Sequence, residues 1–458
     1  MELREYRPPQ LLEAPHAGAR QAQAPAPELD AAVRIVVWEV GVHASLSAEP
    51  LQMWARFVPR ARLAHRNLIQ DQYPQWLPDK CTTLYSHERL ACDTVEDGIT
   101  DLFRRRIPHS ATSKDPFPSI DDFAEEFREL AMEHLPEVDV FLCTVAYLCL
   151  LAEGVDKPIL GYFGHPLLFM VPPEAREAFW PRFARLAASP DVGLAVSDPF
   201  LQMQYDYQVG APRLPAIRTH ALYTGVTHFP TRADEVLVLD RPHESVLMCL
   251  IQRLMHRHTG ASDSDDAARE FGWPTEDGRL RAASSPGYPY RFITRALTDR
   301  SFRTFAQFRA VALWPYDMDL ITFYEFYGMG MPIFMPASLP KYVFQQDHMS
   351  YDGKWPGRRF DRYKPQLWPD DGTGASPFDE GNLDAVRYTV GFSDYFRFPE
   401  VQYFDSIPDL LEKLLTTDFF DVAQRMARFN QDSLVESSNA WRVLLRRTTR
   451  LDHDRLQL

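Results

Sequence analysis

The sequence predicts an α/β protein made of two Rossmann-like halves, each a parallel sheet covered by helices. Short apolar runs alternate with amphipathic stretches between residues 33 and 210, and again between residues 235 and 336. This alternation is the pattern of a doubly wound sheet. Residues 226–234 interrupt it with Pro, Thr and Asp. A chain of 458 residues also favours two domains of roughly 200 residues each.

Composition excludes several classes of protein. The 49 basic and 63 acidic residues give a net charge of −14, which opposes broad contact with nucleic-acid phosphates or anionic lipid. No apolar run reaches the length of about 18 residues that a transmembrane helix needs. Residues 1–30 lack the apolar core of a secretion signal and are rich in Pro and Ala, so we expect a disordered tail and, by default, a cytoplasmic protein.

The cysteines show no metal-binding spacing. Three of the five lie inside apolar segments, and none forms a C-x-x-C pair. We therefore expect buried free thiols in a reducing compartment and no zinc site. The five are Cys81, Cys92, Cys143, Cys149 and Cys249.

The first half is expected to be built on four apolar strands. Residues 50–135 between the first two strands have an irregular helical pattern and carry no chemical motif. A helix over residues 199–208 follows the fourth strand and ends at Gly210. The predicted strands are 33–40, 138–144, 157–163 and 191–197.

Two histidines follow strands of this first half. His43 lies in the loop after the first strand, and His165 lies between Gly164 and Pro166 after the third. The carboxyl ends of parallel strands face the ligand crevice, and glycine lets the backbone approach a ligand closely. Both histidines are therefore candidate catalytic residues, with a purely structural role as the alternative.

The second half repeats the alternation. A segment of mixed aromatic and basic residues, 337–400, interrupts it and is interpreted as an insertion, and amphipathic helices at 407–415 and 419–447 end the chain. The predicted strands are 235–239, 290–294, 310–314 and 333–335, and the predicted helices between them are 243–258, 301–308 and 320–327.

Residues 308–336 concentrate the acidic candidates. Asp317, Asp319 and Glu325 are the only acids in an otherwise apolar and aromatic run. Asp319 is expected to cap the helix 320–327 with its side chain. Gly328 and Gly330 are expected to end that helix, because glycine adopts positive φ without penalty.

This run resembles a motif of one enzyme family. The spacing Asp317, seven residues, Glu325, followed by Gly330-Met331-Pro332, is similar to a segment of the retaining GT-B glycosyltransferases, the group that includes glycogen synthases and family-four enzymes. The strand from Lys157 to His165 and the closing helices are also similar. The resemblance covers about residues 135–335 and 405–450.

The resemblance implies a glycosyltransferase that moves a sugar from a nucleotide-diphosphate sugar to a glycan, protein or small-molecule acceptor, with retention and without a metal cofactor. It implies that Glu325, with Gly328 and Gly330, lies at the donor ribose. Asp317 would lie beside the reacting centre, and His165 would contact the transferred sugar.

Two cations are the best-placed partners for the donor diphosphate. Arg241 and Arg295 each follow a strand of the second half. Such side chains, together with a helix N-terminus, can stabilise a leaving diphosphate without a metal ion.

The resemblance also divides the chain. We expect two Rossmann-like domains facing a cleft, with the C-terminal helices packing back on the first. The expected parts are a tail (1–30), an acceptor domain (31–228), a donor domain (229–425) with the insertion 337–400, and C-terminal helices (426–458).

Four alternatives stay open. Asp317-Met318-Asp319 spells the D-x-D of metal-dependent GT-A glycosyltransferases, whose carboxylates hold Mg²⁺ or Mn²⁺. The family has Glu where this chain has Asp317, and a glycine-containing loop where it has residues 318–321, which also allows a catalytically silent protein that binds sugar nucleotides. An epimerase of GT-B fold is a third alternative. An inverting enzyme with His43 as general base is the fourth.

Overall fold

The computed structural model describes most of two α/β domains. The described residues are 35–41, 43–56, 63–67, 102, 105–106, 119–133, 135–171, 175–209, 213–239, 244–259, 282–294, 297, 299–315, 320–339, 387–388 and 390–449. Among them, no helix is both long and apolar enough to cross a membrane.

The first domain contains a parallel sheet of five strands in the order β2-β1-β3-β4-β5. Four of its strands are almost wholly buried, as expected for a parallel sheet with helices on both faces. The order places the switch point between β1 and β3, where neighbouring connections leave the sheet on opposite sides. The strands are β1 (Ile35–Val40), β2 (Leu63–Asn67), β3 (Val140–Cys143), β4 (Ile159–Phe163) and β5 (Val192–Val196).

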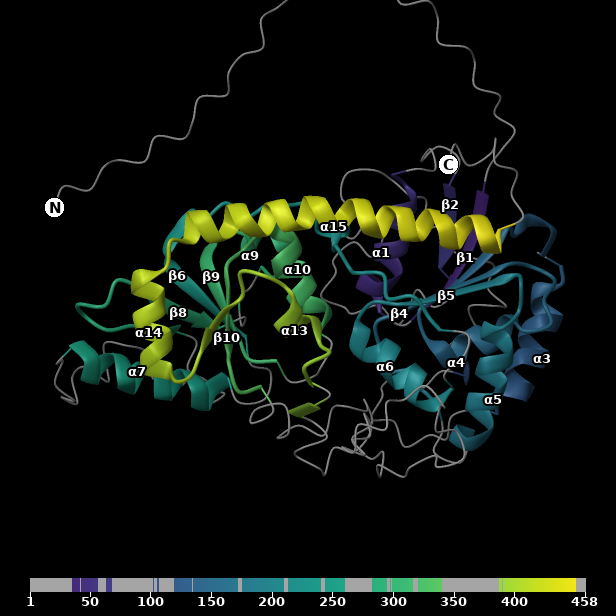
Figure 1. Ribbon diagram of the computed structural model, residues 1–458, viewed down its shortest axis with the longest axis horizontal. Helices are drawn as coiled ribbons and strands as arrows, with labels where there is room; N and C mark the ends of the chain where they lie inside the picture. Colours follow the sequence, from purple (N-terminus) through teal and green to yellow (C-terminus); the bar gives the residue numbers. More distant parts are fainter. Residues whose placement is uncertain are drawn as a thin grey trace, which may run out of the picture.

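Helices cover both faces of this sheet (Figure 1). On one face, α1 packs with the C-terminal helix α15 around Trp54 and Trp441. On the other face, α3, α4, α5 and α6 share a core that includes Phe127, Phe183 and Tyr205. The helices are α1 (Ala44–Trp54), α3 (Ile120–Ala131), α4 (Ala146–Cys149), α5 (Arg176–Ala187) and α6 (Pro199–Gln208), with single 3₁₀ turns at η3 (Leu135–Glu137) and η4 (Leu150–Ala152).

The second domain contains a six-stranded sheet in the order β11-β10-β9-β6-β8-β7. All neighbours are parallel except β7, which pairs antiparallel with β8. Leaving out β7, the five remaining strands have the same order as the first sheet. The strands are β6 (Arg232–Leu239), β7 (Ala282–Ala283), β8 (Arg291–Thr294), β9 (Phe308–Leu313), β10 (Ile333–Pro336) and β11 (Gln402–Phe404).

Helices of the second domain form two layers around this sheet. One layer, α7 and α14, packs on the face that carries Val236, Ala310 and Phe334. The buried helix α10 lies on the other face, toward the first domain. The helices are α7 (Glu244–Thr259), α9 (Phe302–Phe305), α10 (Ile321–Met329), α13 (Asp394–Arg397) and α14 (Ile407–Thr416).

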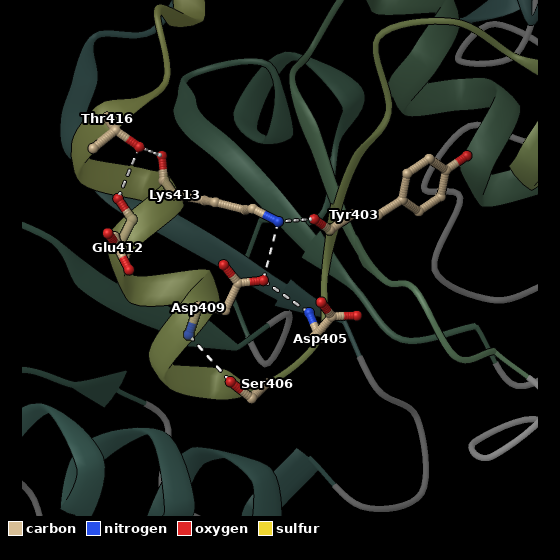
Figure 2. A network of polar contacts seen from close by, with 7 residues as sticks. All are labelled: Tyr403, Asp405, Ser406, Asp409, Glu412, Lys413 and Thr416. Carbon is tan, nitrogen blue, oxygen red and sulfur yellow. Dashed lines mark hydrogen bonds and ion pairs between the residues drawn. The ribbon is translucent and has the colours of Figure 1, made fainter.

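Polar contacts fix the start of α14 (Figure 2). The Asp409 backbone N–H donates to the Ser406 hydroxyl at 3.3 Å, so Ser406 caps the helix. Asp409 Oδ2 accepts from the Asp405 backbone N–H at 2.8 Å and from Lys413 Nζ at 3.0 Å. Lys413 Nζ also donates to the Tyr403 carbonyl in β11 at 2.6 Å. These bonds tie α14 to the edge strand before it.

The last helix, α15 (Phe419–Thr448), spans both domains. Its 30 residues correspond to roughly 45 Å of helix. Asp418 caps its start beside the second domain by accepting two backbone N–H groups. At its end, Trp441 and Leu444 are buried in the core of the first domain. The prediction that the C-terminal helices pack back on the first domain is confirmed, and the expected boundary at residue 426 falls inside α15.

Trp441 is expected to be a major anchor of this helix. Its ring is fully buried and lies 5.7 Å from Trp54 and 5.2 Å from Tyr162, between ring centroids. Trp441→Ala should lower the free energy of unfolding by about 3–5 kcal/mol in denaturant titrations, since it removes a large core side chain. Val443→Ala, at a residue of the same helix that is 65% exposed, should change it by less than about 0.5 kcal/mol. Equal effects of the two variants would contradict this packing.

The predicted apolar strands and long helices of both halves are confirmed, but several local predictions are wrong. Residues 63–67 form β2, a strand that the irregular pattern of 50–135 did not indicate. The helix predicted over 301–308 is the single turn α9, because Phe308 already pairs with Arg232 in the sheet. Helix α10 is preceded by Leu320 as its N-cap, one residue after the predicted Asp319, and the Leu320 N–H donates to the Tyr395 hydroxyl at 2.8 Å.

The expectation of free thiols is also wrong for two cysteines. Cys143 and Cys149 are both buried and form a disulfide between β3 and α4. Cys249 on α7 is free but exposed. Cys81 and Cys92 lie outside the described residues, as does most of the predicted insertion 337–400.

Candidate active site

The first candidate, His43, lies between β1 and α1 of the first domain. It is the N-cap of α1, with extended backbone angles. Its carbonyl oxygen accepts from the backbone N–H groups of Leu46 and Ser47, at 3.1 and 3.2 Å. The Ser47 hydroxyl donates to buried Glu39 Oε1 at 2.6 Å. The backbone of His43 is therefore held at the carboxyl edge of the sheet.

The second candidate, His165, contacts His43. It follows β4, and the two imidazole centroids are 5.5 Å apart with the rings edge to face. The turn at Gly164 packs closely against α1, since a Cβ atom there would lie 2.3 Å from Leu46 Cδ2. Burial, and secondarily the neighbouring His43, lower the pKa of His165 to about 3, so its imidazole is neutral at neutral pH. The structure brings the two predicted histidines together.

Glu325 connects the second domain to the helix that follows His43. Its side chain on α10 is buried, and Oε1 accepts from the Ser45 hydroxyl in α1 and from the Tyr223 hydroxyl, both at 2.9 Å. Burial raises the pKa of this carboxyl group, although both hydrogen bonds oppose that shift. The carboxylate that the resemblance assigns to the donor ribose thus lies at the junction of the two domains.

The segment between the sheets passes beside α1 and α10. Glu49 Oε1 in α1 accepts from the His220 backbone N–H at 2.7 Å, and burial raises the pKa of Glu49 to about 7. Ala221 follows with a φ of 52°, and η6 (Leu222–Thr224) leads toward β6. A Cβ atom on Gly328 would lie 2.4 Å from the His220 carbonyl oxygen. A glycine at position 328 therefore lets α10 lie directly against this connecting segment.

Gly330 ends α10, as predicted. Its φ is 77°, and its N–H donates to the Tyr327 carbonyl at 3.0 Å. This left-handed conformation is accessible to glycine at little cost. Gly328, by contrast, lies within the helix, which continues to Met329.

Several of the candidate residues lie outside the described part of the chain. Asp317, Asp319, Arg241 and Arg295 belong to this group, so their assigned roles remain predictions. In the part of the chain that the structure describes, no group of three or more His, Cys, Asp or Glu side chains could hold a metal ion. The D-x-D alternative depends on Asp317 and Asp319 and likewise remains a prediction.

Sequence reasoning missed the residues that join the two domains. Ser45 lies two positions after His43, but a serine in a helical first turn carries no signal of its own. Tyr223 and Asp198 are separated from their partners on α10 by more than 100 residues. The one local signal is Asp198-Pro199 directly after β5, which is typical of a helix start.

Comparisons with known proteins return similarities only among solved structures. No family model matches, and no curated protein matches. A glycosyltransferase of kitacinnamycin is 14% identical with a TM-score of 0.42, covering 91% of this chain and 99% of that chain. The glycosyltransferase VinC in complex with DTDP is 13% identical with a TM-score of 0.39, covering 90% and 99%. LpCGTa in complex with UDP is 9% identical with a TM-score of 0.44, covering 91% and 100%. At these identities, the function must be argued from the residues of this chain.

Proposed function

We propose that the protein is a glycosyltransferase that transfers a sugar from a nucleotide-diphosphate sugar to an acceptor hydroxyl or similar group. The observation that carries this proposal is the junction of the two parallel sheets. His43 and His165 follow strands of the first domain, and Glu325 of the second domain is bonded to Ser45 next to them. Parallel α/β domains bind ligands at the carboxyl ends of their strands. Two such domains, tied together by a returning C-terminal helix, are also the arrangement of the GT-B glycosyltransferases that the sequence resembles.

The first domain would supply the base. A neutral imidazole at His43 can accept the proton of an acceptor hydroxyl while the acceptor oxygen bonds to the anomeric carbon. The bond from that carbon to the donor diphosphate breaks in the same step, and the nucleoside diphosphate leaves with the electron pair. This reaction inverts the anomeric configuration. His165, held neutral by burial, would orient the sugar or His43 through a ring N–H.

The second domain would bind the donor. The hydrogen bonds from Ser45 and Tyr223 both use Oε1 of Glu325, so Oε2 is the oxygen we assign to the ribose hydroxyls. Arg241 and Arg295 would neutralise the diphosphate, and no metal ion is required for that role. Retention of configuration, which the resemblance at Asp317-x7-Glu325 implies, would instead need Asp317 at the reacting centre. The anomeric configuration of the product distinguishes these two mechanisms.

A nucleotide screen tests the donor assignment. We expect one of UDP, GDP or ADP, or a sugar derivative of one of them, to raise the thermal midpoint at millimolar concentration. A ligand at 100 times its dissociation constant stabilises the folded state by about 2.7 kcal/mol. ATP and inorganic pyrophosphate serve as controls for nonspecific binding of phosphates. No shift with any of these nucleotides or sugar derivatives would contradict the proposal, whereas binding without turnover of any donor would favour the silent alternative.

A further inference from the structure

A second junction between the domains contains two buried carboxyl groups. Asp198 follows β5 of the first domain, and Asp394 begins α13 of the second. Tyr324 on α10 lies between them, with its hydroxyl 2.9 Å from Asp198 Oδ2 and 3.2 Å from Asp394 Oδ2. Asp198 Oδ2 also accepts from the Asp394 backbone N–H at 2.9 Å. Asp198 of the first domain therefore accepts hydrogen bonds from both α10 and α13 of the second domain.

The number of protons at this junction is too small if both carboxyl groups are ionised. A phenol carries one proton, and a carboxylate carries none. The Tyr324 proton can serve one of its two carboxylate neighbours at a time, so the other contact would be between two oxygens without a hydrogen. One additional proton on either carboxyl group makes both contacts hydrogen bonds. Like charges that are buried together also oppose the doubly ionised state.

The electrostatic surroundings of the two carboxyl groups also favour one additional proton. Burial raises the pKa of Asp198 to about 6, and it raises the pKa of Asp394 well above its ordinary value, with the neighbouring Asp198 adding to that rise. Hydrogen bonds from the backbone N–H groups of Asp394 and Phe200 and from the Tyr324 hydroxyl lower the pKa of Asp198, and Arg397 on α13 lowers it less. Arg397, Arg218 from the connecting segment and the Tyr324 hydroxyl lower the pKa of Asp394. From α10, the titratable side chain that faces Asp198 and Asp394 is Tyr324. Asp198 itself is the N-cap of α6. Burial outweighs these opposing interactions.

We propose that Asp198, Tyr324 and Asp394 form a pH-sensitive latch, in which one extra proton shared by the two carboxyl groups holds the domains together. Separation of the domains would expose both carboxyl groups to water and return them to ordinary acidity. The closed form therefore binds a proton that the open form releases. Its stability is greatest at low pH and is lost as the pH rises through the raised pKa values. Glu49 and Glu325, whose pKa values are also raised, act at the other junction, so the test must be specific to this pair.

Small-angle X-ray scattering of the full chain between pH 5 and pH 8 tests the latch. We expect the radius of gyration of the wild type to increase with pH in a single titration step. Asp394→Asn mimics the protonated carboxyl group and should remain compact across the range. Asp405→Asn, at an exposed residue outside the cluster, should behave as the wild type. A radius of gyration that does not change with pH in the wild type would overturn the proposal. The same increase with pH in Asp394→Asn, or the absence of that increase in Asp405→Asn, would also overturn it.

Arg397→Gln provides an independent test if Asp394→Asn does not fold. Arg397 is exposed, so its replacement leaves the core intact. Because Arg397 favours the ionised pair, its loss should move the midpoint of the expansion to higher pH. An unchanged or lower midpoint would contradict the latch. None of these readouts uses sugar transfer, so the latch can fail or hold independently of the proposed enzymatic activity.

Discussion

Replacing His43 by Ala is expected to lower kcat for sugar transfer by about 10²–10⁴-fold, the usual contribution of a positioned general base. The substitution removes the imidazole, but the backbone groups that hold residue 43 between β1 and α1 remain. Donor affinity should therefore change little, because the proposed donor contacts lie on the second domain. Initial rates at saturating donor, combined with nucleotide-binding measurements, separate these two effects.

His258→Ala is the matched control for this substitution. His258 is exposed near the end of α7, in the second domain, and its loss should leave both rate and binding unchanged. A rate for His43→Ala within about twofold of the wild type would remove His43 from the mechanism and favour the retaining alternative with Asp317.

Glu325→Ala is expected to weaken both the fold and donor binding. The substitution leaves the Ser45 and Tyr223 hydroxyls buried without the oxygen that accepts from them. Each buried donor without a partner costs about 1–3 kcal/mol, so the free energy of unfolding should fall by at least that amount. Loss of Oε2 should also weaken binding of the nucleotide identified in the screen.

Glu325→Gln separates the two effects. The amide oxygen can still accept from Ser45 and Tyr223, and the amide is neutral where burial disfavours a charge. Stability at neutral pH should therefore be maintained or increased. Nucleotide affinity should fall by about tenfold if charge-assisted hydrogen bonds to the ribose are lost. Wild-type stability and affinity in Glu325→Ala would contradict both assigned roles.

The alternation of apolar runs was sufficient to predict the two sheets. Strands such as β3 and β10 are buried on both faces, so their sequences are continuously apolar and easily recognised. The exception is β2, an edge strand with the sequence Leu-Ala-His-Arg-Asn. Three of its five residues are polar, so it does not form an apolar run that could be recognised as a strand. The prediction of a helix over 301–308 was wrong because Ser301 caps only a single turn. A residue that favours a helix start does not indicate how long the helix will be.

The candidate site was only partly predictable for a physical reason. His43 and His165 each follow a strand, and parallel strands end at a common edge, so local sequence was enough to bring them together. The bonds of Glu325 join residues 280 and 102 positions apart, and no local pattern specifies such pairs. The disulfide was missed because two cysteines with five residues between them resemble ordinary buried thiols until a strand end and a helical turn bring them together.

Analysis of the reaction products tests the central claim most directly. The protein would be incubated with sugar derivatives of the nucleotide that stabilises it and with a panel of hydroxyl-bearing acceptors, and the products followed by NMR and mass spectrometry. The account predicts release of one nucleoside diphosphate for each glycoside formed, with inverted anomeric configuration and with loss of turnover in His43→Ala. A nucleotide that binds while no donor releases nucleoside diphosphate or forms a glycoside would contradict it.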